Sequence, residues 1–171
     1  KCIKKRHKKN REKLAHDQIK TYCNVGNWSR FYINEMFPDI HYGLYLDLDI
    51  LFTGDISDIF SFNINNNAIG VVPYAPPCTL KKIPIIERNI MIDPIEDIKF
   101  LDLYSINYDD FNNFAYNCGV IYFNFFKFRK LKIKKKIENI IKYMCSNKKL
   151  LYISGTELIQ NICLPKYTEI P

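Results

Sequence analysis

Tyr45-Leu46-Asp47-Leu48-Asp49-Ile50 is an apolar run that predicts a buried strand, although it contains two carboxylates two residues apart. Successive side chains of a strand point to opposite faces, so Tyr45, Asp47 and Asp49 are expected to share one side. Burying an unpaired carboxylate costs on the order of several kcal/mol, and placing two side by side adds repulsion. A divalent cation held by Asp47 and Asp49 would remove both penalties. The pair therefore predicts a metal site, with a purely structural role as the alternative.

The length and composition predict one folded domain over residues 1–171. The chain is 47% apolar and 15% aromatic, which is typical of a globular protein with a sizeable core. No apolar run approaches the roughly 20 residues that span a bilayer. Because the first residue is Lys1 and not Met, we expect an excerpt of a longer protein. That protein is expected in the Golgi or secretory-pathway lumen if it has an upstream membrane anchor, and in the cytoplasm otherwise.

The net charge of +7 arises mainly from two basic runs, residues 1–13 within a basic segment of residues 1–26, and residues 129–136. The first run is explained by a solvated terminus and the second by the polar face of a helix. The alternative is that these runs attract an anionic polymer or nucleotide phosphates. Neither run is interleaved with the aromatic residues of a nucleic-acid reader, so no nucleic-acid partner is expected. The six cysteines are scattered without zinc-ligand spacing, and disulfide pairing stays open.

Helix and strand patterns alternate along the chain. Asn27 is a plausible N-cap for a short helix that Pro38 stops, and Asp55 is a plausible cap for a second helix. Residues 76–113 show no clear period and are expected to form a long irregular loop. Apolar runs predict strands over residues 45–49, 69–73, 119–125 and 150–153, and helices over residues 126–145 and 156–163.

This alternation predicts an α/β fold with a mixed, mostly parallel central sheet flanked by helices. In such sheets ligands collect at the carboxyl ends of the strands. Asp49 stands at that end of its predicted strand, so the acidic pair is expected where a substrate binds.

Two blocks of sequence resemble glycosyltransferase family 8, which includes glycogenin and bacterial lipopolysaccharide sugar transferases. The first is Tyr45-Leu46-Asp47-Leu48-Asp49-Ile50-Leu51, followed by Gly54-Asp55-Ile56-Ser57-Asp58-Ile59-Phe60. The second is Tyr116-Asn117-Cys118-Gly119-Val120-Ile121-Tyr122-Phe123-Asn124, followed by Phe128-Arg129. Arg30 matches an arginine that the family places near the sugar and diphosphate. The resemblance covers residues 28–171.

The resemblance implies a GT-A fold and a retaining transfer of a sugar from a nucleotide diphosphate, usually uridine diphosphate, to a glycan or protein acceptor. It implies that Asp47 and Asp49 hold Mn²⁺ or Mg²⁺, hard cations that prefer oxygen ligands, with the backbone of Leu48 against the nucleotide. Arg30 and Asn117 are the implied catalytic residues, with Cys118 beside the sugar. Two alternatives stay open: Arg30 pairs with Glu35 or Asp39, or Asn117 merely caps a strand end.

Departures from the family pattern fall in the last part of the chain. Family members carry Asp-Gln-Asp where this sequence reads Gly155-Thr156-Glu157, so these three residues are the expected sugar contacts and two of them lack the usual side chains. The family's downstream His-x-x-Gly-x-x-Lys motif and its first nucleotide-binding strand are not recognised, so part of the donor site is expected to be missing. Two alternatives therefore stand beside the enzyme: a degenerate homologue that binds a nucleotide sugar or a partner, and a basic module that binds anionic polymers.

Overall fold

The structure is a computed structural model that describes residues 25–79, 112–147 and 156–170. Most of the basic segment of residues 1–26, most of the predicted loop of residues 76–113, the strand predicted over residues 150–153 and Gly155 lie outside this description. Within the described ranges, none of the helices combines the length and apolar character needed to cross a bilayer. Cys78, Cys118 and Cys163 are free thiols.

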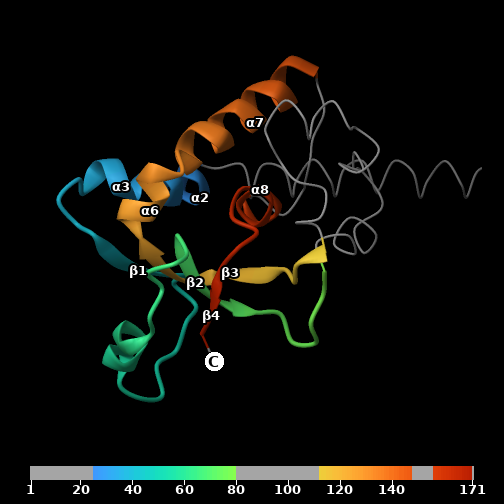
Figure 1. The fold of residues 1–171 in the computed structure, drawn as a ribbon. Coiled ribbons are helices and arrows are strands. Elements are labelled where there is room, and N and C mark those ends of the chain that lie inside the picture. The colour runs from blue at the N-terminus through green and yellow to red at the C-terminus, as the bar shows by residue number, and fades with distance from the viewer. Residues whose placement is uncertain (1–24, 80–111, 148–155, 171) are drawn as a thin grey trace, which may run out of the picture.

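The described elements form a sheet with the α-helices gathered on one side (Figure 1). In chain order they are α2 (Val25–Ser29), the 3-10 helix η1 (Arg30–Tyr32), α3 (Ile33–Met36), β1 (Tyr42–Leu46), the 3-10 helix η2 (Ile56–Ser61), β2 (Ile69–Pro73), β3 (Tyr116–Asn124), α6 (Phe125–Lys130), α7 (Ile133–Asn147), α8 (Glu157–Cys163) and β4 (Thr168–Glu169).

The sheet has the order β1-β3-β2-β4. Strand β3 pairs antiparallel with both β1 and β2, and only the β2–β4 pair is parallel. The prediction of a mixed sheet is confirmed for the described strands, but the prediction that it is mostly parallel is wrong. The strand predicted over residues 69–73 is confirmed. Strand β4 was not predicted, because two residues carry no readable alternation.

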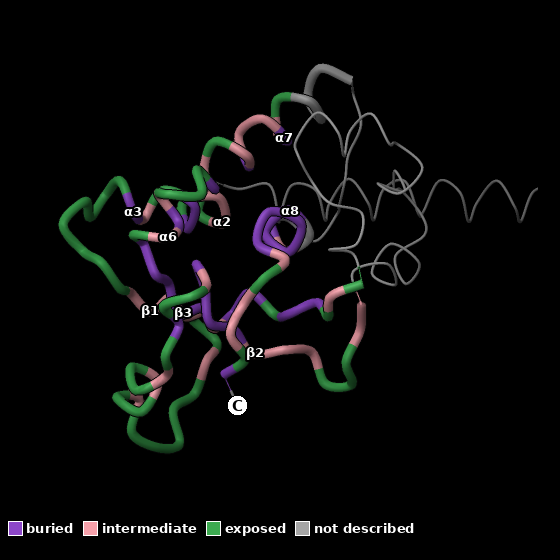
Figure 2. Tube along the Cα trace, viewed as in Figure 1, coloured by how far each residue is buried: buried purple, intermediate pink, exposed green. Residues whose placement is uncertain are grey.

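Strand β3 is the centre of the core because both of its faces are covered. Ile121 and Phe123 belong to the main apolar cluster, which also contains Phe128 of α6 and Ile137 of α7. Tyr122 points the other way, into a smaller cluster with Ile64 and Ile170. Figure 2 shows the buried trace concentrated in β3 and α8, with exposed backbone in the segment that follows β1.

The predicted helix caps have different outcomes. Asp55 is an N-cap as predicted, since its side chain accepts a hydrogen bond of 2.8 Å from the amide of Ser57 at the start of η2. Asn27 is not a cap, because it lies inside α2, which begins at Val25. The helical stretch does end at Met36, ahead of Pro38.

The continuous helix predicted over residues 126–145 is wrong. Helix α6, capped by the Asn124 side chain, ends at Lys130, and α7 begins at Ile133. Lys132 between them has a φ of 53°, a left-handed conformation that glycine usually adopts at a helix end. No glycine or proline signals this break, so the periodic apolar residues predict one helix.

Helix α8 confirms the last predicted helix and is fixed to β3 by a buried side chain. The Asn161 amide accepts a hydrogen bond from the Tyr116 amide at 3.0 Å and donates to the Tyr116 carbonyl at 3.1 Å. These bonds satisfy the backbone N–H and C=O groups of Tyr116, which would otherwise be buried without a partner. They also bring the start of α8 next to the carboxyl end of β1.

Candidate functional site

A cavity of about 260 Å³ lies where β1 ends, beside β3 and the start of α8. It contains six of the predicted site residues, which come from four separate segments: Arg30, Asp47, Asn117, Cys118, Thr156 and Glu157. Asn27 and Gly119, which were not predicted as site residues, also line it. Leu48 and Asp49 are not among its lining residues.

The acidic pair occupies a turn. Strand β1 ends at Leu46, and residues 47–50 form a turn closed by a hydrogen bond of 3.2 Å from the Ile50 amide to the Asp47 carbonyl. Asp49 and Leu48 are exposed, and the Asp47 side chain is 39% exposed. The predicted strand is present but covers Tyr42–Leu46 and not residues 45–49, and the predicted burial of both carboxylates is wrong. The chain leaves the sheet as soon as Asp47 has paired its amide with the Gly119 carbonyl, so burial alone demands no cation.

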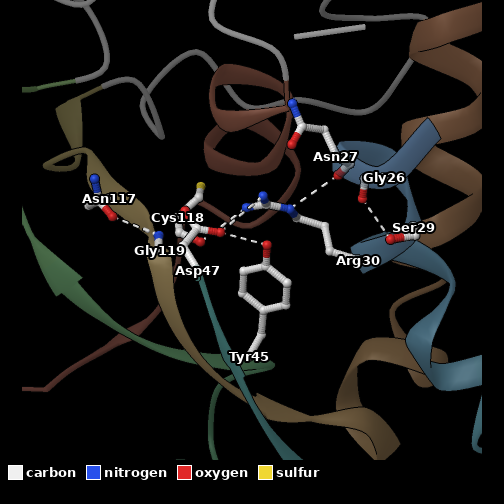
Figure 3. A network of polar contacts seen from close by, with 9 residues as sticks. All are labelled: Gly26, Asn27, Ser29, Arg30, Tyr45, Asp47, Asn117, Cys118 and Gly119. Carbon is white, nitrogen blue, oxygen red and sulfur yellow. Dashed lines mark hydrogen bonds and ion pairs between the residues drawn. The ribbon is translucent and has the colours of Figure 1, made fainter. Parts of the chain in front are cut away.

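One oxygen of Asp47 is already bound within the chain. Its Oδ1 accepts a hydrogen bond of 2.6 Å from the Tyr45 hydroxyl and forms an ion pair of 3.4 Å with Nη2 of Arg30 (Figure 3). Burial, together with this hydrogen bond to Asp47, raises the pKa of Tyr45 to about 12. Tyr45 thus stays a neutral donor that orients the carboxylate toward the cavity.

Arg30 is buried and joins three segments of the chain. Its guanidinium donates to the Asn27 carbonyl at 3.1 Å and to the Cys118 carbonyl at 3.0 Å, in addition to the contact with Asp47. It also lies 4.5 Å from the centroid of the Tyr45 ring, a cation–π geometry. The alternative pairing with Glu35 is wrong, since Glu35 binds Lys134.

Asn117 and Cys118 reach the cavity from β3. The Asn117 Oδ1 accepts a hydrogen bond of 2.6 Å from the Gly119 amide, so this exposed side chain folds back onto its own strand. Burial raises the pKa of the Cys118 thiol to about 12, which keeps it protonated and unreactive. A Cβ at Gly119 would lie 2.8 Å from Asn117 Oδ1 and 3.3 Å from Asp47 Oδ2, so the absence of a side chain there leaves room for both oxygens.

Thr156 and Glu157 form the opposite wall. Thr156 is buried at the start of α8, and the Glu157 carboxyl accepts a hydrogen bond from the Tyr74 hydroxyl. Burial raises the pKa of Glu157 to about 7; the charge of Arg30 acts against this rise and that of Asp47 adds to it. Tyr74 was not predicted, because it follows β2 in an ordinary apolar sequence and only the fold brings it to Glu157.

The available donors suit a hard cation in part. Asp47 Oδ2 faces the space beside Gly119, and Asp49 is exposed on the same turn, so both can present carboxylate oxygens. Within residues 25–79, 112–147 and 156–170, no group of three or more His, Cys, Asp or Glu side chains is positioned to hold a metal ion. The described residues thus fit a cation that takes two ligands from this turn and the remainder from substrate, water or other parts of the protein.

The fold resembles those of solved glycosyltransferases. The computed structure resembles, over 84% of the chain, the glycosyltransferase GlyE of Streptococcus pneumoniae TIGR4, with a TM-score of 0.51, 18% identity and coverage of 28% of that chain. It resembles the bifunctional glycosyltransferase WbbM with a TM-score of 0.58, 15% identity and coverage of 84% of this chain and 24% of that one. The galactosyltransferase LgtC, solved with donor and acceptor sugar analogs, gives a TM-score of 0.50 with 15% identity and coverage of 85% and 44%. These likenesses show the predicted GT-A fold.

Sequence relatives indicate the same family. A segment of 51 residues, 30% of the chain, is 39% identical to a probable galacturonosyltransferase 10 of Arabidopsis thaliana, covering 10% of that protein. The chain thus spans less than half the length of each of these four relatives. The sequence pattern of Glycosyl transferase family 8 matches residues 1–170. The chain therefore belongs to glycosyltransferase family 8.

Proposed function

We propose that this chain supplies the donor-binding part of a metal-dependent, retaining glycosyltransferase. The donor is a nucleotide diphosphate sugar, most simply a uridine diphosphate sugar, and the acceptor is a glycan or a protein. The observation that carries the proposal is the cavity itself, in which a buried guanidinium, two carboxyl groups and an amide converge from four segments. A family member with a purely structural role would not need this concentration of polar groups at one end of its sheet.

In this proposal Arg30 stabilises the departing diphosphate. Its three contacts hold the guanidinium in place before substrate binds, so no reorganisation is needed as negative charge develops. Because one Asp47 oxygen only partly neutralises it, Arg30 keeps an attraction for phosphate oxygens.

Asp47 and Asp49 are the proposed ligands of Mn²⁺ or Mg²⁺, with Leu48 between them placing its backbone toward the nucleotide. The bound cation would neutralise charge on the diphosphate. The contacts from Tyr45 and Arg30 occupy Oδ1 of Asp47 and leave Oδ2 open. Asp49, with an exposed side chain, can turn toward the same point.

The sugar is proposed to lie between Asn117, Cys118 and the start of α8. A carboxyl with a pKa near 7 can either donate to a sugar hydroxyl or accept from one, so Glu157 is suited to orient the sugar. Thr156 completes this wall, with a shorter side chain than the glutamine common at that place in the family. Gly155, where the family carries an aspartate, stays a proposed sugar contact from the resemblance alone.

The proposal is tested by Asp49→Asn in the full-length protein. We expect Mn²⁺-dependent release of nucleotide from a uridine diphosphate sugar to fall by about 100-fold or more. The reason is that the cation, which stabilises the transition state by about several kcal/mol, loses a charged ligand. The fold should be intact, since Asp49 is exposed. Asp58→Asn is the matched control, an equal charge change on an exposed residue of η2. Unchanged activity in Asp49→Asn would contradict the assignment.

A second candidate, donor binding without turnover, is favoured by one observation. Thr156 stands buried in the cavity wall where family members carry a longer polar side chain, so the wall is less equipped for chemistry. Calorimetry with a uridine diphosphate sugar and Mn²⁺ distinguishes the two functions. Metal-dependent binding with no release of nucleotide would establish the second candidate, and turnover would exclude it.

A further inference from the structure

A second groove, lined by apolar side chains and by several charged ones, lies between α3 and the junction of α6 with α7. Its volume is about 610 Å³, and it shares no lining residue with the cavity beside Arg30. Figure 1 shows α3 next to α6 at the point where α7 starts. The basic run of residues 129–136, which the donor site does not use, contributes four cations to this groove: Arg129, Lys132, Lys134 and Lys135.

Two polar atoms of the groove are buried without a hydrogen-bond partner. They are Nη1 of Arg129 and Oδ1 of Asn34, and Asn34 is only 8% exposed. Buried polar groups in native proteins are nearly always satisfied, and an unpaired donor on a charged group is especially costly. A guanidinium nitrogen withdrawn from water within a groove therefore indicates a ligand that accepts hydrogen bonds.

The carboxylates of the groove do not supply that acceptor. Glu35 and Glu138 both bind Lys134, with Nζ to Oε1 distances of 2.5 Å and 3.5 Å. Lys134 also lies 4.7 Å from the centroid of the Tyr32 ring. This arrangement neutralises the two acidic side chains around one lysine, and among the described residues no carboxylate forms an ion pair with Arg129, Lys132 or Lys135.

The backbone conformation of Lys132 also indicates a ligand in this groove. Its φ of 53° is strained for a residue with a side chain, whereas glycine adopts such a conformation freely. A lysine at this point directs a third cation to the groove at some expense in stability. Three uncompensated cations and a buried amide thus surround one volume.

We propose that this groove is a second anion-binding site, which recognises a phosphate or diphosphate group separately from the donor cavity. The fork of Arg129 matches two phosphate oxygens, and Lys132 and Lys135 supply charge around it. Asn34 completes the site by bonding a hydroxyl of the phosphate or of the molecule that carries it. The phosphate can belong to a free solute or to a lipid headgroup, which present the same chemistry.

The experiment measures binding of inorganic pyrophosphate to the full-length protein by calorimetry, in buffer containing EDTA so that the donor site lacks its cation. A parallel arm measures co-sedimentation with phosphatidylcholine vesicles that contain phosphatidate. We expect Arg129→Gln to weaken binding by about tenfold or more, and Arg129→Lys to weaken it less because the charge is kept. If the Arg129 variants weaken binding of pyrophosphate, the phosphate belongs to a free solute; if they weaken co-sedimentation with the vesicles, it belongs to a lipid headgroup.

Two further variants separate a ligand site from a structural one. Lys132→Gly removes a cation while placing the residue best suited to a positive φ, so we expect an unchanged or higher melting temperature with affinity lowered about threefold. Lys142→Gln, an equal charge change on exposed α7 outside the groove, is expected to leave affinity unchanged. The proposal is overturned if neither probe binds, or if Arg129→Gln and Lys142→Gln bind as the unaltered protein does.

Discussion

Strand β3 and the segment that follows β1 are both rich in apolar residues, yet they have opposite environments. In β3, Ile121 and Phe123 are at most 1% exposed. After β1, Leu48, Leu51 and Phe52 are 106%, 85% and 53% exposed. The difference lies in what covers them: β3 has a strand on each side and helices on one face, whereas residues 47–55 leave the sheet. Apolar composition therefore does not decide burial here; position in the sheet does.

The proposed donor cavity lies at the boundary between these two regions. Its walls on β3 and α8 are rigidly packed, as the buried Cys118 and Thr156 show. Its acidic side comes from the exposed turn that carries Asp49. Under the proposed function, the packed side would hold the sugar and the exposed turn would leave the cation and the diphosphate open to solvent.

The largest expected effect tests the contrast in packing directly. Phe123→Ala removes a side chain that contacts both Phe125 and Phe128, and we expect the free energy of unfolding to fall by about 3–5 kcal/mol. Phe52→Ala makes the same chemical change on the exposed segment and should cost no more than about 0.5 kcal/mol. Urea denaturation of both variants measures the difference. Equal losses would show that Phe52 is covered in the folded protein and would remove the contrast.

The next effect concerns Glu157, which lies on the packed side of the boundary. Its folded pKa of about 7 exceeds its ordinary value of 4.5, so the folded chain binds more protons than the unfolded chain between these pH values. Stability from this group is present below pH 4.5 and is lost as the pH rises through 7. At about 1.36 kcal/mol per pKa unit, the free energy of unfolding should fall by roughly 3 kcal/mol across this range.

Glu157→Gln is the matched control for that pH dependence, because glutamine keeps a hydrogen-bond acceptor for Tyr74 without titrating. Denaturant unfolding of both proteins at several pH values isolates the contribution of the carboxyl. If the two proteins show parallel pH profiles, the Glu157 carboxyl is as accessible to water as the turn residues are, and the boundary lies elsewhere.

The smallest effect compares two glycines across the same boundary. Gly119→Ala places a Cβ 2.8 Å from Asn117 Oδ1 and 3.3 Å from Asp47 Oδ2, so we expect both side chains to shift and donor affinity to fall about tenfold. Gly54→Ala meets no atom within 4 Å on the exposed segment and should be neutral. Titration with a uridine diphosphate sugar and Mn²⁺ compares the variants. Equal affinities would show that the two oxygens have no part in binding.

The sequence predicted those features that depend on local chemistry. The cap at Asp55, the strand of β2 and the helix α8 all follow from neighbouring residues, and the structure confirms them. The gathering of Arg30, Asp47 and Glu157 in one cavity was predicted only through family resemblance. Their separation along the chain is too large for any local pattern to indicate contact.

The features that could not be predicted depend on tertiary packing. The turn after Leu46 follows an apolar sequence that reads as a strand. Strand β1 ends there although β3 continues to Tyr116, and the Cys118 carbonyl of β3 accepts a hydrogen bond from Arg30. The break at Lys132 needs a conformation that lysine seldom adopts. Tyr45 and Tyr74 reach the two carboxyl groups of the cavity through the fold, and a tyrosine in an apolar run gives no sign of such a contact.

The contact between Arg30 and the carbonyl of Cys118 joins residues that are 88 positions apart. During translation the ribosome must therefore have released β3 before the guanidinium can be fixed. Strands β1 and β2 also lack their shared partner until then, because both pair with β3. A nascent chain stopped short of Tyr116 would carry the acidic turn and the arginine without a shared site. The proposed nucleotide-sugar site is thus complete only after β3 and the start of α8 have been made.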